Sequence, residues 1–143
     1  MGSAREIGDR SVEAFNSHDQ AAIRAMFADS VVFEAPGDVR LEGPDATAGY
    51  AMGWLNAFPD SKITVHNNIE AGDLVIHEFT FEGTHEQPLQ GPAGEIPPTG
   101  RRLAGRGIEV LRIEGDKIIE DRLYFDQVQV MTQLGLMPGP ASA

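Results

Sequence analysis

The chain contains no cysteine among its 143 residues. Disulfide bonds, thiolate nucleophiles and sulfur-ligated zinc are therefore excluded. Positive charge is also scarce, because 11 Lys and Arg face 22 Asp and Glu, for a formal net charge of -11. Binding to nucleic-acid phosphates or to anionic lipids needs a positive patch, so these charges disfavour nucleic acid and membranes as partners. They favour a neutral or weakly charged small molecule.

Long apolar runs are missing as well. No stretch approaches the roughly 18 apolar residues of a membrane span, and the first 15 residues carry charges where a signal peptide needs an apolar run. We therefore expect a cytoplasmic protein. The sequence has no glycine-rich phosphate loop, G-x-S-x-G elbow or H-E-x-x-H motif, which removes nucleotide-binding, serine-hydrolase and metalloprotease functions.

What the sequence does contain is the composition of an ordinary globular domain. Hydrophobic residues make up 41% and charged residues 23% of the chain, close to the averages for globular proteins. The length is typical of one domain. We place this single domain at 1–143 and expect 137–143 to be a flexible tail.

Apolar residues in the first part of the chain recur at helical spacing. They predict a first helix from Ala4 to a turn at 16–19, a second, short helix through 21–27, and a third helix over 46–57. Asp19 is the expected N-cap of the second helix, because its carboxylate can accept hydrogen bonds from free backbone N–H groups. A short strand is expected at 31–34.

The second part of the chain alternates apolar and polar residues, as half-buried strands do. Strands are predicted at 63–69, 74–85, 103–113 and 118–125, and a last helix at 126–136. The segment 87–100 holds four prolines and three glycines, which predicts an extended, exposed loop and a candidate pocket lid. Helices followed by antiparallel hairpins predict an α+β fold whose curved sheet and helices enclose a cavity.

Several short pieces between 71 and 138 resemble the SnoaL-like polyketide or ester cyclases. In that family's order they are GDLV at 72–75, FEGTH at 81–85, PPTGR at 97–101, GDKIIE at 115–120, YFD at 124–126 and QLGL at 133–136. The helical first half fits the same layout with more generic pieces. The resemblance implies an NTF2-like cone, in which a curved antiparallel sheet, three N-terminal helices and a short C-terminal helix surround an apolar pocket. It also implies a homodimer.

The same resemblance implies proton-transfer chemistry without a metal or an organic cofactor, such as an aldol-type ring closure. In the family an aspartate at the end of the last strand is the acid/base, and Asp126 matches that position. The family's histidine and glutamine on the preceding strand have no counterpart in GIEVLRI at 107–113. These two roles therefore do not carry over, so the resemblance supports the fold more strongly than it supports a polyketide substrate.

Asp126 and His85 are the predicted catalytic residues. An aspartate that removes a proton next to a carbonyl needs a pKa raised by burial, and apolar residues flank Asp126. Capping of the last helix is the alternative role. His85 lies at a strand end and could polarise a carbonyl, or it could be structural. A metal site is not expected, because His77 and His85 lie about 26 Å apart along an extended strand.

Further residues are expected to contact the substrate. Tyr50 and Trp54 lie one helical turn apart, so both can face one cavity, where the Tyr50 hydroxyl could stabilise an oxyanion; a core stripe is the alternative. Glu109 and Arg112 point to opposite faces of their strand, and solvated cross-strand ion pairs are the alternative for both. The predicted substrate-binding residues are Phe33, Tyr50, Trp54, Phe58, His77, Phe79, Glu109 and Tyr124.

Three functions stay open at this point. The first is a cofactor-independent cyclase or isomerase that acts on a small hydrophobic carbonyl compound through Asp126. The second is a non-catalytic binding or dimerisation domain for a lipid-like or terpenoid-like molecule. The third is epoxide hydrolysis, which would require Asp126 and Arg112 to meet around a water.

Overall fold

The computed structural model describes residues 3–91 and 94–138. The helices are α1 (Ala4–Asn16), α2 (Gln20–Arg24), α3 (Pro44–Ala57) and α4 (Gln127–Gln133). The strands are β1 (Phe27–Ala35), β2 (Val39–Glu42), β3 (Lys62–Ala71), β4 (Leu74–Thr84), β5 (Leu89–Gly91), β6 (Gly94–Ile96), β7 (Arg102–Glu114) and β8 (Lys117–Phe125). All the predicted helices and long strands are confirmed, and β2, β5 and β6 are additions.

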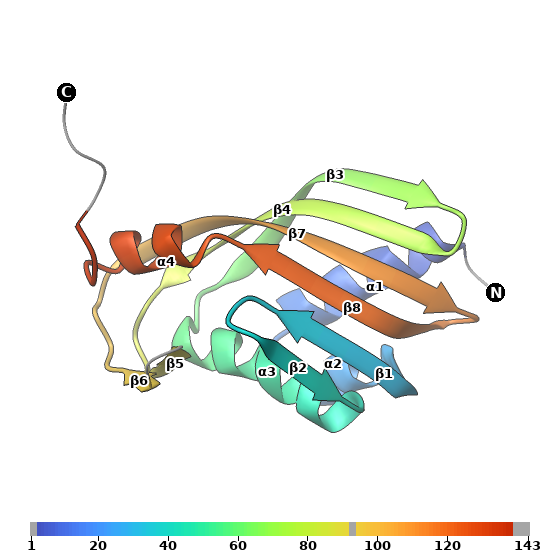
Figure 1. The fold of residues 1–143 in the computed structure, drawn as a ribbon, viewed down its shortest axis with the longest axis horizontal. Helices are drawn as coiled ribbons and strands as arrows, with labels where there is room; N and C mark the ends of the chain where they lie inside the picture. The colour runs from blue at the N-terminus through green and yellow to red at the C-terminus, as the bar shows by residue number, and fades with distance from the viewer. Residues whose placement is uncertain (1–2, 92–93, 139–143) are drawn as a thin grey trace.

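The main sheet has six strands in the order β2-β1-β8-β7-β4-β3 (Figure 1). Neighbouring strands run antiparallel except β1 and β8, which run parallel, so the expected fully antiparallel sheet is corrected at this pair. The backbone N–H of Ile118 donates to the carbonyl of Met26 at 2.9 Å. The chain therefore passes from α2 into β1 at the end of the sheet where β8 begins. Strands β1 and β8 both start at that end and run in the same direction.

Helices α1, α2 and α3 cover one side of the curved sheet (Figure 1). Helix α1 packs against β3, β4 and β7, and α3 packs against β1 and β2. The predicted cap of α2 is confirmed, because the Asp19 carboxylate accepts hydrogen bonds from the N–H groups of Ala21 and Ala22. No described helix is long and apolar enough to cross a bilayer.

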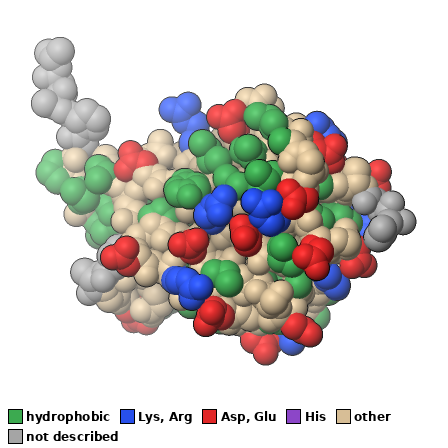
Figure 2. Space-filling model, turned by 45° about the vertical axis from the view of Figure 1, so that its right-hand side comes forward, with side chains coloured by type: hydrophobic (Ala, Val, Ile, Leu, Met, Phe, Trp, Pro, Cys, Tyr) green, Lys and Arg blue, Asp and Glu red, His purple; other side chains and the backbone are tan. Residues whose placement is uncertain are grey.

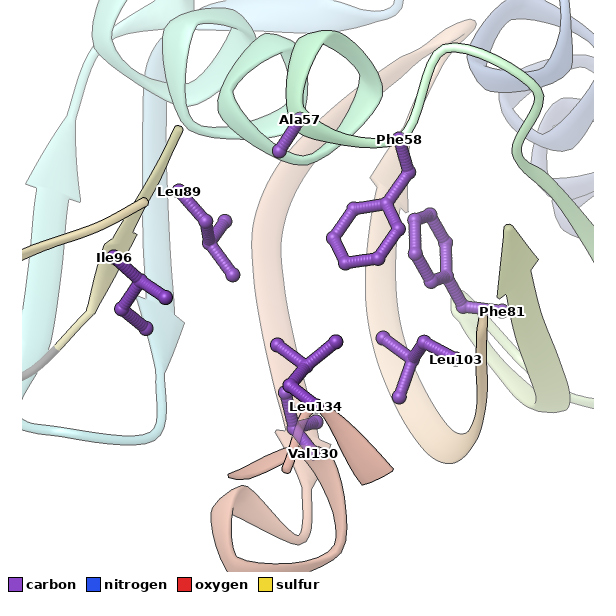
Figure 3. Close-up of a cluster of buried hydrophobic side chains, with 8 residues drawn as sticks. All are labelled: Ala57, Phe58, Phe81, Leu89, Ile96, Leu103, Val130 and Leu134. Carbon is purple, nitrogen blue, oxygen red and sulfur yellow. The ribbon is translucent and has the colours of Figure 1, made fainter. Parts of the chain in front are cut away.

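A buried hydrophobic cluster lies between α3, the sheet and α4 (Figure 3). It joins α3 and the residue after it to β4, β5, β6, β7 and the region of α4 through Ala57, Phe58, Phe81, Leu89, Ile96, Leu103, Val130 and Leu134. Burying one large apolar side chain contributes about 1.5–3 kcal/mol. The cluster therefore holds the short α4 and the β5–β6 hairpin against the sheet.

The segment 87–100 differs from the exposed loop that its composition predicts. Its described residues include the β5–β6 hairpin, in which Leu89 pairs with Ile96, and these two side chains are only 5% and 9% exposed. Prolines 97 and 98 follow the hairpin and do not interrupt it, so they are compatible with local pairing. Residues 92–93 and, within the predicted tail, 139–143 lie outside the described residues.

Ion pairs occupy the outer face of the sheet. Arg112 pairs with Asp73 at 2.9 Å and with Glu120 at 3.3 Å. The prediction that Glu109 and Arg112 point to opposite faces is thus confirmed, because Glu109 lines the interior cavity. Figure 2 shows acidic and basic side chains interspersed with hydrophobic ones over the face it presents.

Candidate active site

A cavity of about 120 Å³ lies between the sheet and the helices. Residues of all four described helices and of five strands line it. The strands contribute because every second residue of each points inward. Its aromatic lining residues are Phe15, Phe27, Phe33, Tyr50, Trp54, Phe79, Phe81 and Phe125. An apolar cavity of about 150 Å³ can hold benzene, so a volume of this order suits a small apolar group.

The aromatic wall is held by contacts between its own rings. The Trp54 ring lies edge-to-face against Phe81 at 5.6 Å and against Phe125 at 5.5 Å between centroids. Phe33 and Tyr50 pack at 4.7 Å. Such contacts add stability beyond area burial and fix the ring orientations, so the cavity has a defined shape before any ligand enters.

Two carboxyl groups, Glu109 on β7 and Asp121 on β8, project into this apolar cavity. Strand pairing sets Asp121 opposite Leu111 and Glu109 opposite Leu123, so the two acids are diagonal neighbours on one face. Asp121 is 4% exposed. Its Oδ1 has no hydrogen-bond partner among the described residues, which leaves this oxygen available to a ligand.

Each of the two acids disfavours ionisation of the other. Burial raises the pKa of Asp121 well above its usual value, and the neighbouring charge of Glu109 raises it further. Burial also raises the pKa of Glu109, while a hydrogen bond from Asp121 partly opposes that increase. Two carboxyl groups this close in an apolar cavity disfavour being ionised at the same time, so they titrate as a pair.

Tyr50 on α3 adds a hydroxyl group to the site. Burial raises the pKa of its hydroxyl, and the charges of Asp121 and Glu109 add to this effect, while the Trp54 side chain acts in the opposite direction as a hydrogen-bond partner. The hydroxyl therefore stays protonated and can donate to an oxygen that gains negative charge. Tyr50 thus lies in the cavity as expected, and its role toward an oxyanion stays a prediction.

The cavity brings together part of the predicted substrate-binding set. Phe33, Tyr50, Trp54, Phe79 and Glu109 line it. Phe58 does not, because it is fully buried in the core cluster and stacks on Trp54 from behind at 6.0 Å. Tyr124 is 53% exposed and lies on the outer face of β8, since strand alternation sends it away from Leu123 and Phe125.

Asp126 lies outside the cavity lining. It is exposed, and its carboxylate accepts hydrogen bonds from the N–H groups of Val128 at 2.9 Å and Gln129 at 3.2 Å. The structure thus shows the helix-capping role that was the alternative for this residue. The apolar flanking residues do not bury Asp126, because it follows the inward-facing Phe125 at the strand end.

The two candidate histidines are buried outside the cavity lining. His85 Nδ1 accepts a hydrogen bond from the N–H of Thr99 at 3.2 Å, and its ring stacks on Phe58 at 5.2 Å. It therefore ties the end of β4 to the segment before β7. His77 lies beneath α1, close to Gly8. Burial lowers the pKa of both histidines.

Asp121 is the site residue that sequence reasoning missed. A signal was present, because Phe125, Leu123 and Asp121 follow one another at strand spacing and two of the three are apolar. A single acid in an apolar stripe is costly unless it is functional or partnered. No group of three His, Asp or Glu residues within 3–91 and 94–138 is arranged to hold a metal ion.

A sequence model described as SnoaL-like polyketide cyclase matches residues 6–134. The chain belongs to the SnoaL-like polyketide cyclase family. This finding confirms the predicted family, and the family match supports a cyclase-type or isomerase-type function. Comparison with curated proteins gives no match.

Solved structures confirm the NTF2-like α+β fold of this SnoaL-like chain. IdmH, a candidate polyketide cyclase from Streptomyces antibioticus, is 26% identical with a TM-score of 0.79, over 94% of this chain and 99% of its own. AclR, a candidate hydroxylase from Streptomyces galilaeus, is 24% identical with a TM-score of 0.82, over 96% and 84%. An LEH-like epoxide hydrolase from M. tuberculosis is 20% identical with a TM-score of 0.70, over 92% and 88%.

Proposed function

We propose that this protein is a cofactor-independent cyclase or isomerase that acts on a small hydrophobic carbonyl compound through the Glu109–Asp121 pair. The observation that carries the proposal is that two neighbouring carboxyl groups, Glu109 and Asp121, lie inside an aromatic cavity. Buried acids with raised pKa values are suited to general acid/base chemistry near neutral pH. Family membership and the candidate cyclase IdmH support the same class of reaction.

The two acids have complementary roles in the proposed reaction. The ionised Glu109 removes a proton from the carbon next to the substrate carbonyl. The protonated Asp121 donates a hydrogen bond to the carbonyl oxygen. The Tyr50 hydroxyl donates to the same oxygen as charge develops. The resulting enolate carbon forms a bond to a second carbonyl carbon in a cyclisation, and the new alkoxide takes up a proton; in an isomerisation the proton returns to another carbon.

The test is conversion and binding measured on the same compounds. A panel of cyclic and linear ketones is screened by ligand-induced melting shifts, and compounds that bind are followed for conversion. We expect Asp121→Asn to bind the hits and to lose activity by about 10²-fold or more, because general acid catalysis contributes this much. Asp116→Asn, the same change in the exposed β7–β8 turn, serves as the matched control.

The outcome also separates the alternatives. If wild type binds compounds and converts none, the non-catalytic binding domain is the better description. If Asp126→Asn abolishes conversion while Asp121→Asn retains it, the acid/base role returns to Asp126. We expect the reverse, because asparagine can still cap α4.

The structure does not favour epoxide hydrolysis by the residues considered for it. That proposal needs Asp126 and Arg112 around one water, but Arg112 is engaged with Asp73 and Glu120 on the outer face. Asp126 caps α4 at the far end of β8. Turnover of an epoxide that survives Asp121→Asn would contradict this conclusion.

A further inference from the structure

The charges inside the cavity are unbalanced. Glu109 and Asp121 are its acidic lining residues, and among the described lining residues Arg106 is the one basic group. Arg106 is exposed, alternates with the inward Gly105 and Gly107 on β7, and is not among the groups that shift the pKa of either acid. The negative charge of the pair therefore has no protein cation beside it in the described structure.

The groups around the pair are those that attract organic cations. Phe33 on β1 is the direct cross-strand neighbour of Asp121, and the Tyr50 ring packs on Phe33. Tyr50 is close enough to both acids for their charges to act on its hydroxyl. The faces of aromatic rings carry partial negative charge and bind ammonium groups, more strongly when water is excluded.

One buried oxygen is free to receive such a group. Asp121 Oδ1 lies in the cavity wall without a hydrogen-bond partner in the part of the chain that the structure describes, on a side chain that is 4% exposed. An unpaired buried carboxyl oxygen is costly, and a donor N–H from a ligand would remove that cost. A neutral hydrocarbon of the same shape would leave the oxygen unpaired.

We propose that the cavity binds hydrophobic ammonium cations, with the protonated nitrogen against Asp121 and Glu109 and the hydrocarbon groups against the aromatic wall. The proposal uses the same cavity and carboxyl pair as the proposed function, but it requires no catalysis. The formal net charge of -11 supports it by raising the local concentration of cations. A cation bound in this place would exclude a carbonyl compound from the pair.

Two probes of equal shape test the proposal. N,N-dimethylbenzylamine is cationic at neutral pH, and isobutylbenzene replaces its nitrogen by carbon. Titration calorimetry is expected to show the amine binding at least about tenfold more tightly to wild type. In the double variant Glu109→Gln/Asp121→Asn we expect this preference to vanish while isobutylbenzene binds as before, which also shows that the variant is folded.

A matched variant controls for the overall negative charge. Glu114→Gln/Asp116→Asn removes two exposed carboxylates from the β7–β8 hairpin, and it is expected to retain the preference for the amine. The proposal is overturned if wild type binds both probes equally, or if the two double variants lose the preference to the same extent. If wild type binds isobutylbenzene but does not prefer the amine, the cation proposal fails and the catalytic proposal stands. If wild type prefers the amine but converts no carbonyl compound, the catalytic proposal fails and the cation proposal stands.

Discussion

At the scale of single residues, the buried carboxyl pair makes the stability of the fold depend on pH. Burial raises the pKa values of Asp121 and Glu109 above those of the unfolded chain. Their contribution to the free energy of unfolding is therefore fully present below the ordinary carboxyl pKa of about 4 and is lost as the pH rises through the raised values. The buried histidines act in the opposite direction, since burial lowers their pKa values.

The double variant Glu109→Gln/Asp121→Asn isolates this effect. Relative to wild type it is expected to gain stability steadily between pH 4 and pH 8, because it lacks the titrating pair and keeps both histidines. Urea unfolding at a series of pH values measures the difference. A difference that stays constant with pH would show that the two acids have ordinary pKa values in the folded protein.

Single residues also show how far sequence reasoning reaches. The inward positions of Phe33, Phe79 and Glu109 follow from strand alternation, and those of Tyr50 and Trp54 from helical spacing. Asp121 could not be predicted from the family resemblance, because the resemblance points to the strand end at Asp126. Asp126 can cap α4 because β8 ends one residue earlier, at Phe125. A difference of one residue in strand length therefore decides its role.

At the scale of elements, α4 completes a strand edge that β8 leaves free. The pairing of β7 with β8 ends at Gly107 and Phe125. Beyond it, Gln133 accepts a hydrogen bond from the Ala104 N–H at 2.7 Å and donates to the Ala104 carbonyl at 3.1 Å. Gln129 accepts from the Arg106 N–H at 3.1 Å. Two glutamine side chains thus replace a strand beside the cavity.

Replacing Gln133 by leucine should loosen this attachment. We expect a loss of about 1–2 kcal/mol in the free energy of unfolding, the usual effect of two lost hydrogen bonds. Amide exchange at Ala104 should accelerate relative to Leu111 in the same strand. Gln127→Leu, at the other end of α4, is the control; equal acceleration in both variants would contradict a specific role for Gln133.

The elements that the sequence missed share a physical cause. Strand β2 has four residues, and β5 and β6 have three each. Strands this short do not show a clear alternation of apolar and polar residues. The parallel pairing of β1 with β8 arises from contacts between the two ends of the chain, and local sequence patterns do not encode such contacts. The long helices and strands were predictable because each buries one continuous face.

At the scale of the whole molecule, the outer face of the sheet carries an apolar patch. Ile108 and Tyr124 are direct cross-strand partners and are 40% and 53% exposed. We propose that two copies of the chain associate through this patch, as the family resemblance implies. Apolar groups on adjacent central strands are typical of surfaces that bury against a partner.

Light scattering coupled to size exclusion tests this association. Wild type is expected to have the mass of a dimer, and Tyr124→Glu the mass of a monomer, because a charge in the patch would have to be buried. Gln20→Glu places the same charge on the exposed surface of α2 and should remain dimeric. A monomeric wild type would overturn the proposal.

The position of β8 in the sheet also sets the order in which the molecule can be made. Strands β1 and β2 connect to β7, β4 and β3 only through β8, which is the last of these strands to leave the ribosome. Until it emerges, the nascent chain holds two separate β-fragments with unpaired edges, a state that slows folding and invites aggregation. Asp121 arrives on this same strand, so the proposed acid enters the protein at the step that closes the sheet.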